Sequence, residues 1–396
     1  MKKLPLLALA TCLAGVFVGV ACGEDTATVR PRLDGGGGDG ALDGALDGGS
    51  GMLACGVPVP TTYESAAFAQ NAAVEIALTQ SFIELGAKMR SAEGAGTDTV
   101  SVNDLNAIYS AGAPSLRAVS TTGAQSSADA YFAAFAAATG DKTWDPADAA
   151  GDGGAASGGK LDGKFIVDAV GLDLRAATEK TLLGGALYNH VVGVVASPMS
   201  EATVDKLVAA FGASPTFANR SDVTVDADAG VDVDRLLASH ASRLDGTSAE
   251  MPGPYRRMKT ALLRMKAAAK GGESCRADLD ESITTFLVEW ERTTYGAAIF
   301  FLSAAASSAA DPTAQASTLH AYGEALGFIQ SFKGVSRRKI TDAQIDALLV
   351  KIGAADPYRL LTSAGDRSLK LNEAINDIAL YQGFTPAEVQ AFRQPL

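Results

Sequence analysis

The sequence predicts an all-α protein, a multi-helix bundle of one or two packed helical subdomains. From Thr61 onward, apolar residues recur at the 3.6-residue spacing of helices, in segments rich in Ala, Leu, Glu, Gln and Lys. Clusters of Gly, Pro and Asp separate these segments, and no convincing run of alternating apolar and polar residues indicates a strand. The chain has 396 residues, of which 47% are hydrophobic and 20% charged, so it is long enough to bury a large core.

The first 21 residues have the composition of an export signal. A short cationic start precedes an almost uninterrupted apolar stretch, residues 4–21, and Cys22 follows directly. This order predicts a signal peptide over residues 1–21 and lipid attachment at Cys22, which would hold the mature chain to a membrane. Two alternatives stay open. Cleavage without a lipid is one, because Gly19 stands where bacterial lipoprotein signals usually have Leu, and an uncleaved anchor of marginal length is the other.

The signal also predicts a location, the cell envelope of a bacterium. Gly23 follows the cysteine in place of the Asp that favours the inner membrane, so the outer membrane is favoured over the inner one. Residues 22–51 are rich in Gly and Asp and bury too little apolar surface to offset the entropy of ordering. We therefore expect a disordered tether between the lipidated cysteine and the folded domain.

The periodic segments predict helices over residues 62–91, 102–111, 125–138, 173–197, 200–212, 231–244, 254–270, 277–309, 313–332, 341–353, 368–381 and 385–393. The helix over 277–309 is apolar nearly all round in its second half, so we place it in the middle of the bundle. A glycine-rich break at 151–159 separates an expected N-terminal helical subdomain, residues 52–150, from a C-terminal one, residues 160–396.

Two cysteines remain in the mature domain, Cys55 and Cys275. In an oxidising compartment two such thiols can pair, and the bridge would tie the start of the domain to the loop before the helix over 277–309. Two unpaired, packed thiols are the alternative, because the sequence does not give the distance between them.

The formal net charge of −12 and the pI near 4.8 argue against a nucleic-acid partner, since phosphate binding needs a cationic surface. One basic stretch, residues 256–270, alternates with apolar residues at helical spacing. We interpret it as the solvated face of an amphipathic helix, with docking on anionic lipid head groups as the alternative.

Catalytic signatures are missing from the sequence. It contains no His-Glu-x-x-His zinc motif, no Cys-x-x-Cys pair and no Gly-x-Ser-x-Gly turn. Residues 154–160 have the spacing of a phosphate-binding loop, but Leu161 replaces the Ser or Thr that would hold magnesium. The sequence therefore predicts no catalytic residue and no organic cofactor.

The histidines give one candidate polar or metal site. His320 and Glu324 stand four residues apart on one expected helix, so their side chains share a face and would jointly hold a metal ion or a proton. Glu289, on the preceding helix, would complete the site if the two helices form an antiparallel hairpin. The alternative is a pair that only stabilises its own helix. We expect His190 in the core and His240 at the surface.

Several short motifs follow one another in a characteristic order along the chain. The motifs are Trp290, Ile299-Phe300-Phe301-Leu302, residues 320–328, Lys339-Ile340-Thr341 and residues 345–349, after an N-terminal helix about residues 63–89 and the segment 105–109. In this order the chain resembles a bacterial envelope family known only as domain of unknown function 4856. The resemblance implies an all-helical, often lipid-anchored protein with no established activity. The segment 204–212 departs from the family pattern and keeps only its Ala-Phe-Gly ending.

A looser similarity connects the chain to imelysin-like helical lipoproteins, which are tied to iron uptake and use a Gly-x-His-x-x-Glu motif. The order His320-x-x-x-Glu324 does not meet that motif, so iron binding enters by analogy only. Two functions are therefore expected. The first is a non-enzymatic envelope lipoprotein, held to the membrane by its N-terminal lipid, whose helical domain binds a ligand or an envelope protein. The second is a metal-binding protein centred on His320 and Glu324.

Overall fold

Helices form where the sequence supplies both an apolar stripe and end signals. Four helices begin at a capping box, in which the cap side chain and the side chain three residues later bond each other's backbone; the caps are Ser101, Ser200, Thr341 and Thr385. Three helices end at a glycine in the left-handed conformation, Gly212, Gly353 and Gly383. These local signals fix where each helix starts and stops.

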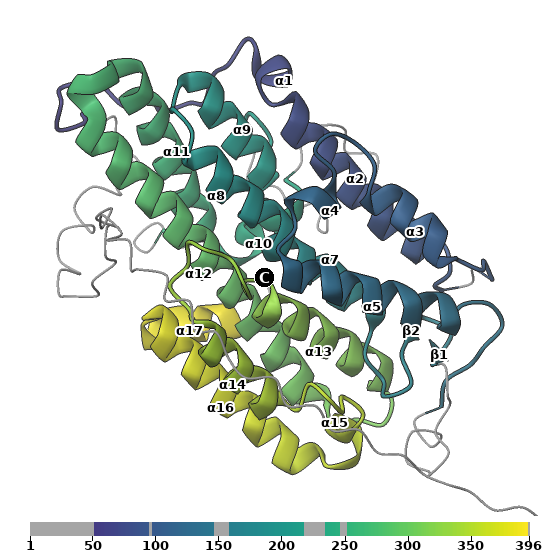
Figure 1. Cartoon of the computed structure of the whole chain (residues 1–396). Helices are drawn as coiled ribbons and strands as arrows, with labels where there is room; N and C mark the ends of the chain where they lie inside the picture. The colour runs from purple at the N-terminus through teal and green to yellow at the C-terminus, as the bar shows by residue number, and fades with distance from the viewer. Residues whose placement is uncertain (1–50, 95–96, 146–157, 218–233, 246–251, 395–396) are drawn as a thin grey trace, which may run out of the picture. The chain divides into compact units, whose positions relative to one another are not determined.

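The computed structural model describes residues 51–94, 97–145, 158–217, 234–245 and 252–394, all of which belong to one unit, Asp39–Leu396. Its elements are α1 (Phe68–Asn71), α2 (Ala73–Arg90), α3 (Val102–Tyr109), α4 (Leu116–Val119), α5 (Thr122–Ala138), β1 (Gly159–Leu161), β2 (Phe165–Val167), α7 (Leu174–Leu182), η1 (Leu183–Tyr188), α8 (Asn189–Val195), α9 (Glu201–Phe211), α10 (Leu236–Leu244), α11 (Pro254–Gly271), η2 (Gly272–Cys275), α12 (Arg276–Ser308), α13 (Gln315–Gln330), α14 (Asp342–Ile352), α15 (Arg359–Thr362), α16 (Ala364–Gln382) and α17 (Pro386–Arg393) (Figure 1). The predicted signal peptide, Cys22 and the predicted tether lie outside the described residues.

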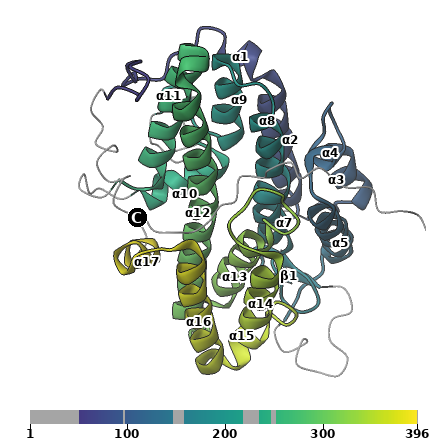
Figure 2. The same cartoon turned by 60° about the vertical axis from the view of Figure 1, so that its left-hand side comes forward.

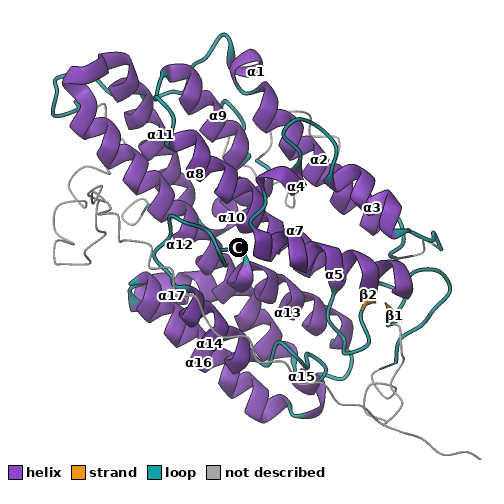
Figure 3. Ribbon diagram, in the orientation of Figure 1, coloured by secondary structure: helices purple, strands orange, loops and turns teal. Residues whose placement is uncertain are grey.

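The prediction of an all-α bundle is confirmed. Helices make up almost all of the regular structure of the described residues, beside one pair of three-residue strands (Figure 3). The pair β1–β2 is antiparallel and was not predicted, because three residues are too few to show an alternating pattern. The short helices α4 and α15 were missed for the same reason, and the expected helix over 62–91 begins only at Phe68.

The long helix α12 occupies the middle of the bundle, as its apolar sequence predicts. It packs on α10, α11, α13, α16 and α17, and its Trp290, Tyr295 and Ile299 are fully buried. Both views place α9 and α11 toward one end of α12 and α14, α15 and α16 toward the other (Figures 1 and 2). One apolar cluster includes buried side chains from Leu53 to Phe392. The expected subdomain boundary falls near residues 146–157, outside the described residues, so the subdivision stays a prediction.

The helices α12 and α13 form an antiparallel hairpin whose register is fixed by two hydrogen bonds. The Tyr295 hydroxyl donates to the carbonyl of Ile329 (3.1 Å), and the Ser308 and Thr318 hydroxyls lie 2.7 Å apart. Because an α-helix rises about 1.5 Å per residue, this register places the level of His320 near residues 304–306 and far from Glu289.

The helices α7 and α13 approach each other closely because two glycines of α13 face α7. A Cβ atom at Gly323 would lie 3.0 Å from Cβ of Asp173, and one at Gly327 would lie 2.7 Å from Cβ of Lys180. Real Cβ atoms rarely come so near other atoms, so these two positions need glycine. The close approach brings side chains of α7 next to His320 and Glu324.

A disulfide joins Cys55 to Cys275, with 5.1 Å between their Cα atoms. The Asp278 carboxylate accepts hydrogen bonds from the backbone N–H groups of Ala54 (2.9 Å) and Cys55 (3.0 Å). The start of the folded domain is thus tied to the beginning of α12 by one covalent bond and two hydrogen bonds.

The basic stretch over 256–270 is not a solvated face, contrary to our interpretation. Its apolar partners are buried in the bundle, and its cations are mostly paired: Arg256 with Asp245, Arg257 with Glu289, and Lys266 with Asp205. α11 packs on α9, α10 and α12, so residues on several of its sides are covered. No helix of the described residues combines the length and the apolar composition that a bilayer crossing requires.

Candidate functional site

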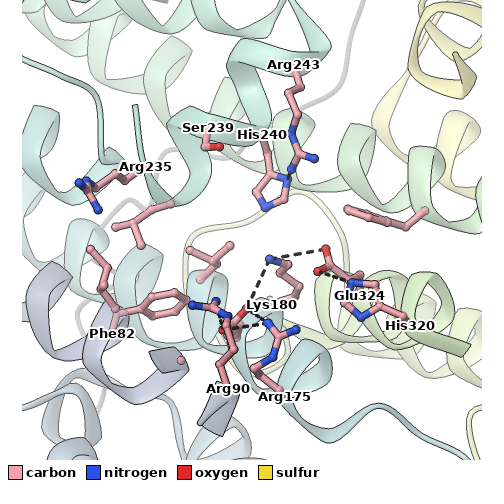
Figure 4. A pocket seen from close by; sticks show the side chains of 16 residues that line it. Phe82, Arg90, Arg175, Lys180, Arg235, Ser239, His240, Arg243, His320 and Glu324 are labelled. Atoms are coloured by element: carbon pink, nitrogen blue, oxygen red, sulfur yellow. Dashed lines mark hydrogen bonds and ion pairs between the residues drawn. The ribbon is translucent and has the colours of Figure 1, made fainter. Parts of the chain in front are cut away.

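A pocket of about 430 Å³ lies where α2, α7, α10, α12 and α13 meet (Figure 4). Its lining combines apolar side chains with many ionisable ones. The lining residues are Phe82, Ile83, Gly86, Arg90, Arg175, Glu179, Lys180, Leu183, Arg235, Leu236, Ser239, His240, Arg243, Phe301, His320 and Glu324. Five of them are Arg or Lys and two are Glu, so the wall is cationic in a chain whose net charge is −12.

His320 is held by a carboxylate on one ring nitrogen and by a parallel ring. Its Nδ1 donates to Oδ2 of Asp173 (2.7 Å), and Phe165 of β2 stacks on the imidazole at a centroid distance of 4.3 Å. Asp173 is fully buried, and its Oδ1 accepts from the N–H of Ala176 as the N-cap of α7 (2.9 Å). The helix start and the small hairpin therefore fix how His320 is oriented.

The same contacts favour the charged form of His320. Burial works against an imidazolium, but the hydrogen bond to Asp173 and the negative charges of Asp173 and Glu324 outweigh it, and the pKa of His320 is raised above its ordinary value of 6.5. The second ring nitrogen, Nε2, is then an N–H donor, and it lies 3.6 Å from Oε1 of Glu324.

Glu324 is 6% exposed and has no hydrogen bond to its carboxylate within the described part of the chain. Its Oε2 is buried and lies 3.5 Å from Nζ of Lys180, an ion pair rather than a hydrogen bond of normal length. Oε1 has only the 3.6 Å approach to His320. A buried carboxylate oxygen without a hydrogen-bond donor points to a further donor at this place.

Arg175 and Lys180 supply the positive charge of α7. Arg175 Nε donates to Glu93 (2.7 Å) and its Nη1 lies 3.3 Å from Glu179. Burial disfavours the Arg175 cation, but the carboxylates of Glu179, Glu93 and Asp173 outweigh it and raise its pKa. Burial also raises the pKa of Glu93 to about 7, against the effect of Arg175 beside it. Glu93 therefore balances Arg175 only in part at neutral pH.

His240 lies in the pocket wall and is 7% exposed, so the expectation of a surface histidine is wrong. Burial, together with the charges of Lys180 and Arg243, lowers the pKa of His240 well below 6.5. The imidazole is therefore neutral at physiological pH. Arg243 Nη2 donates to its Nδ1 (2.6 Å), which fits a ring whose Nδ1 carries no proton.

Two arginines give the pocket accessible positive charge. Arg235, at the N-cap of α10, is exposed and its side chain has no hydrogen bond or ion pair among the described residues. Arg90 of α2 has an exposed side chain whose one ion pair within the described part of the chain is with Glu179, at 3.7 Å. Figure 4 shows Arg235 on one side of Lys180, His320 and Glu324 on the other, and Arg243 with His240 above Lys180.

The structure does not bring Glu289 to His320 and Glu324. Glu289 lies 2.8 Å from Nε of Arg257 and 3.6 Å from Nε of Arg292, and it does not line the pocket. Among the described residues, the only three His, Cys, Asp or Glu side chains close enough to share a metal ion are Cys55, Cys275 and Asp278. The two cysteines form the disulfide there, so their sulfurs are not thiolate ligands.

His190 is partly buried and bonded to Glu75 through Nε2 (2.8 Å), which agrees with the expectation of a satisfied core histidine. Asp173, Lys180 and Arg243 carry no sequence motif and were not predicted as site residues. The sequence did contain a sign that another helix packs closely on α13, because Gly323 and Gly327 stand four residues apart and leave one face of α13 without side chains. That spacing does not say which helix fills it.

No family model, no curated protein and no solved structure matches this chain. The resemblance to domain of unknown function 4856 therefore stays a prediction. No residue of the pocket takes its role from a relative, and the function is argued from the pocket alone.

Proposed function

We propose that the helical domain binds a small organic anion in the pocket between α2, α7, α10 and α13. The observation that carries the proposal is the cationic wall in a strongly acidic chain. The charge of the described lining stays positive when the buried carboxylates of Glu93 and Asp173 are included, because five Arg or Lys side chains then face four carboxylates, and the raised pKa of His320 favours one further positive charge. Positively charged side chains that line one pocket repel one another, and a bound anion reduces this repulsion.

The size and composition of the pocket support a small ligand. A volume of about 430 Å³ lies within the usual range for small-molecule sites. Phe82, Leu236 and Phe301 supply apolar surface, and the guanidinium groups of Arg235 and Arg243 have the planar, forked geometry that suits a carboxylate or phosphate. The ligand that fits this wall is a carboxylated or phosphorylated molecule of modest size.

Titration calorimetry of the purified full chain tests the proposal, with citrate, malate, succinate and inorganic phosphate as probes. We expect binding of at least one organic anion that weakens at raised salt, because ions screen the attraction. Arg235→Gln should weaken it about tenfold, since one charge-assisted contact is lost. Arg359→Gln, an exposed arginine outside the pocket, is the matched control and should bind like the wild type. Equal affinities for the wild type and Arg235→Gln would contradict the proposal.

We also propose that the protein is an envelope lipoprotein, with Cys22 acylated and the domain carried on the tether of residues 22–51. The charge and apolar run of residues 1–21 support this, and the Cys55–Cys275 disulfide fits an oxidising compartment. Mass spectrometry of the N-terminus tests it. The expected result is a chain that starts at an acylated Cys22, and Cys22→Ser should move the protein out of the membrane fraction. An intact, unmodified Met1 on cytosolic protein would overturn it.

A metal-binding protein is the second candidate. Histidine ligands commonly donate their other ring N–H to a carboxylate, which is how Asp173 holds His320, and Nε2 then faces Glu324. The residues fit a metal poorly, because Lys180 lies beside Glu324 and the wall is cationic. Metal analysis of the full chain and of a His320→Ala, Glu324→Ala variant decides this. Equal metal content in both would remove the candidate.

A further inference from the structure

The pocket has two chemically different ends. The pair of His320 and Glu324 belongs to α13 and lies on the other side of Lys180 from Arg235, the N-cap of α10, while Arg243 of α10 stands above Lys180 (Figure 4). The arginines of the wall offer donors to a ligand anion. The α13 end offers one donor and one acceptor next to each other, and a bare anion would use only the donor and be repelled by the Glu324 carboxylate.

The donor and the acceptor at the α13 end are close enough to share one ligand atom. His320 Nε2 and Glu324 Oε1 lie 3.6 Å apart, too far for a hydrogen bond between them. An oxygen atom placed about 2.8 Å from each would accept from Nε2–H and donate its own proton to Oε1. A hydroxyl group does both at once, whereas a carboxylate or the dianion of a phosphate monoester has no proton to donate.

Both partners are held in place before any ligand arrives. Phe165 stacks on the His320 ring, and Asp173, the N-cap of α7, accepts a hydrogen bond from Nδ1. The orientation of the ring, and with it the position of Nε2, is therefore fixed. Glu324 is held beside Lys180 by the close packing of α7 on α13 at Gly327. Groups that are already oriented lose little entropy when they bind, which favours a specific contact at this point.

We propose that the ligand is an organic anion that also carries a hydroxyl group, with the hydroxyl between His320 Nε2 and Glu324 Oε1 and the anionic group among the arginines of the wall. This inference rests on the proposed anion-binding function and adds the class of anion. Hydroxy acids and sugar phosphates share this chemistry. Plain dicarboxylates lack the hydroxyl and leave the two polar groups of α13 unpaired, which lowers their affinity.

Matched pairs of probes test the inference on the full chain by titration calorimetry. Citrate and tricarballylate differ only in one hydroxyl, and so do malate and succinate. For the wild type we expect the hydroxylated member of at least one pair to bind roughly 10-fold to 100-fold more tightly, the range for a hydrogen bond to a charged group. Sugar phosphates are compared by titrating glucose 6-phosphate against methyl phosphate, whose dianion has no hydroxyl, and a preference found in this pair alone indicates a phosphorylated ligand.

Two variants of the lining separate the hydroxyl contact from a general effect of charge. Glu324→Met removes the acceptor at similar side-chain length and should bring the affinity ratio of each pair close to one. Glu179→Gln also removes a carboxylate from the wall, but one that pairs with Arg90, Arg175 and Lys180. It should strengthen both members of a pair alike and keep their ratio. A thermal melt shows whether each variant is folded. If Glu324→Met does not fold, the ratio of the affinities of the wild type for the two members of each probe pair still tests the inference.

The outcomes distinguish this inference from the proposed function. If anions bind in a manner that depends on Arg235 but each pair binds equally, the anion-binding function stands and the hydroxyl contact is overturned. If Glu179→Gln abolishes the preference as completely as Glu324→Met does, the contact is likewise overturned. If none of the probes binds, the proposed function fails and this inference fails with it.

Discussion

Asp173 joins the start of α7 to His320 of α13 through one carboxylate. Oδ1 caps the helix at the N–H of Ala176 (2.9 Å) and Oδ2 accepts from His320 Nδ1 (2.7 Å). The same buried group therefore stabilises a helix end and raises the pKa of a histidine of the pocket. The contact with His320 depends on the close approach of α7 and α13, which Gly323 and Gly327 allow.

Asp173→Asn separates these two tasks. Asn is as good a helix cap as Asp, but it carries no charge, so we expect the pKa of His320 to fall when the variant folds. An NMR titration of the histidine ring signals measures this. Citrate should bind the variant more weakly at neutral pH, because His320 then lacks its second proton. Asp366→Asn, at an exposed position, is the control, and an unchanged His320 pKa in Asp173→Asn would contradict the account.

His240 makes the domain sensitive to acid. Its folded-state pKa lies well below 6.5, so as the pH falls through 6.5 the unfolded chain takes up a proton that the folded chain refuses. The contribution of His240 to stability is therefore complete above pH 6.5 and declines below it, down to the folded-state pKa. His240→Gln should lose less unfolding free energy than the wild type over that acidic range, in urea titrations at several pH values. Parallel pH profiles of the two proteins would show that His240 is not the group responsible.

His320 affects the pH dependence of stability in the opposite direction. Its raised pKa contributes stability that is fully present below pH 6.5 and is lost as the pH rises through the folded-state value. The same urea titrations on His320→Gln should show a smaller decline above pH 6.5 than in the wild type. An identical decline in both would contradict the raised pKa.

Gly327→Ala tests the close packing behind the site. A Cβ at this position would lie 2.7 Å from Cβ of Lys180 and 2.8 Å from the carbonyl oxygen of Ala177. We expect the variant to lose about 1–3 kcal/mol of unfolding free energy and to bind citrate more weakly, because α7 must move. Gly193→Ala in α8 has nothing within 4 Å of the new Cβ and should be stabilising by about 0.5–1 kcal/mol. If urea denaturation finds that both variants gain stability, the helices are not in close contact at Gly327.

The disulfide closes a loop of 220 residues in sequence separation, so its removal should lower the free energy of unfolding by up to about 5 kcal/mol in the chain-entropy model. Cys55→Ser combined with Cys275→Ser is the variant to measure by chemical denaturation. A reducing agent should shift the wild type to the same midpoint and leave the double variant unchanged. A wild type that does not respond to the reducing agent would show that no bond stabilises the fold.

The helices could be read from the sequence, whereas the site could be read only in part. Periodicity and end signals locate α12, α13 and α14 within a few residues, because the information is local. The antiparallel hairpin of α12 and α13 also follows from the short connection between them. Counting residues back from that connection would have placed Glu289 about 20 Å from the level of His320, so this candidate ligand was open to correction from the sequence itself.

The cationic wall of the pocket could not be predicted from the sequence. Arg90, Lys180, Arg243 and Glu324 are separated by tens of residues, and only tertiary packing brings them together. The surface expectation for His240 failed for the same reason: the hydrophobic pattern of α10 shows an apolar face, but not that α7 and α13 place charges against it. The stacking of Phe165 on His320 could not be predicted either, because the β1–β2 hairpin that positions Phe165 is too short to leave a pattern in the sequence.

Hydrogen–deuterium exchange of the full chain with and without citrate tests most directly whether the pocket binds an anion. Ligand contacts suppress local opening, so exchange should slow in peptides that cover Arg235 with α10 and residues 315–324 of α13, where Arg243, His320 and Glu324 lie. The same experiment on Arg235→Gln should show weaker protection at equal citrate concentration. Protection confined to segments outside the pocket lining, or equal exchange with and without saturating citrate, would contradict the account.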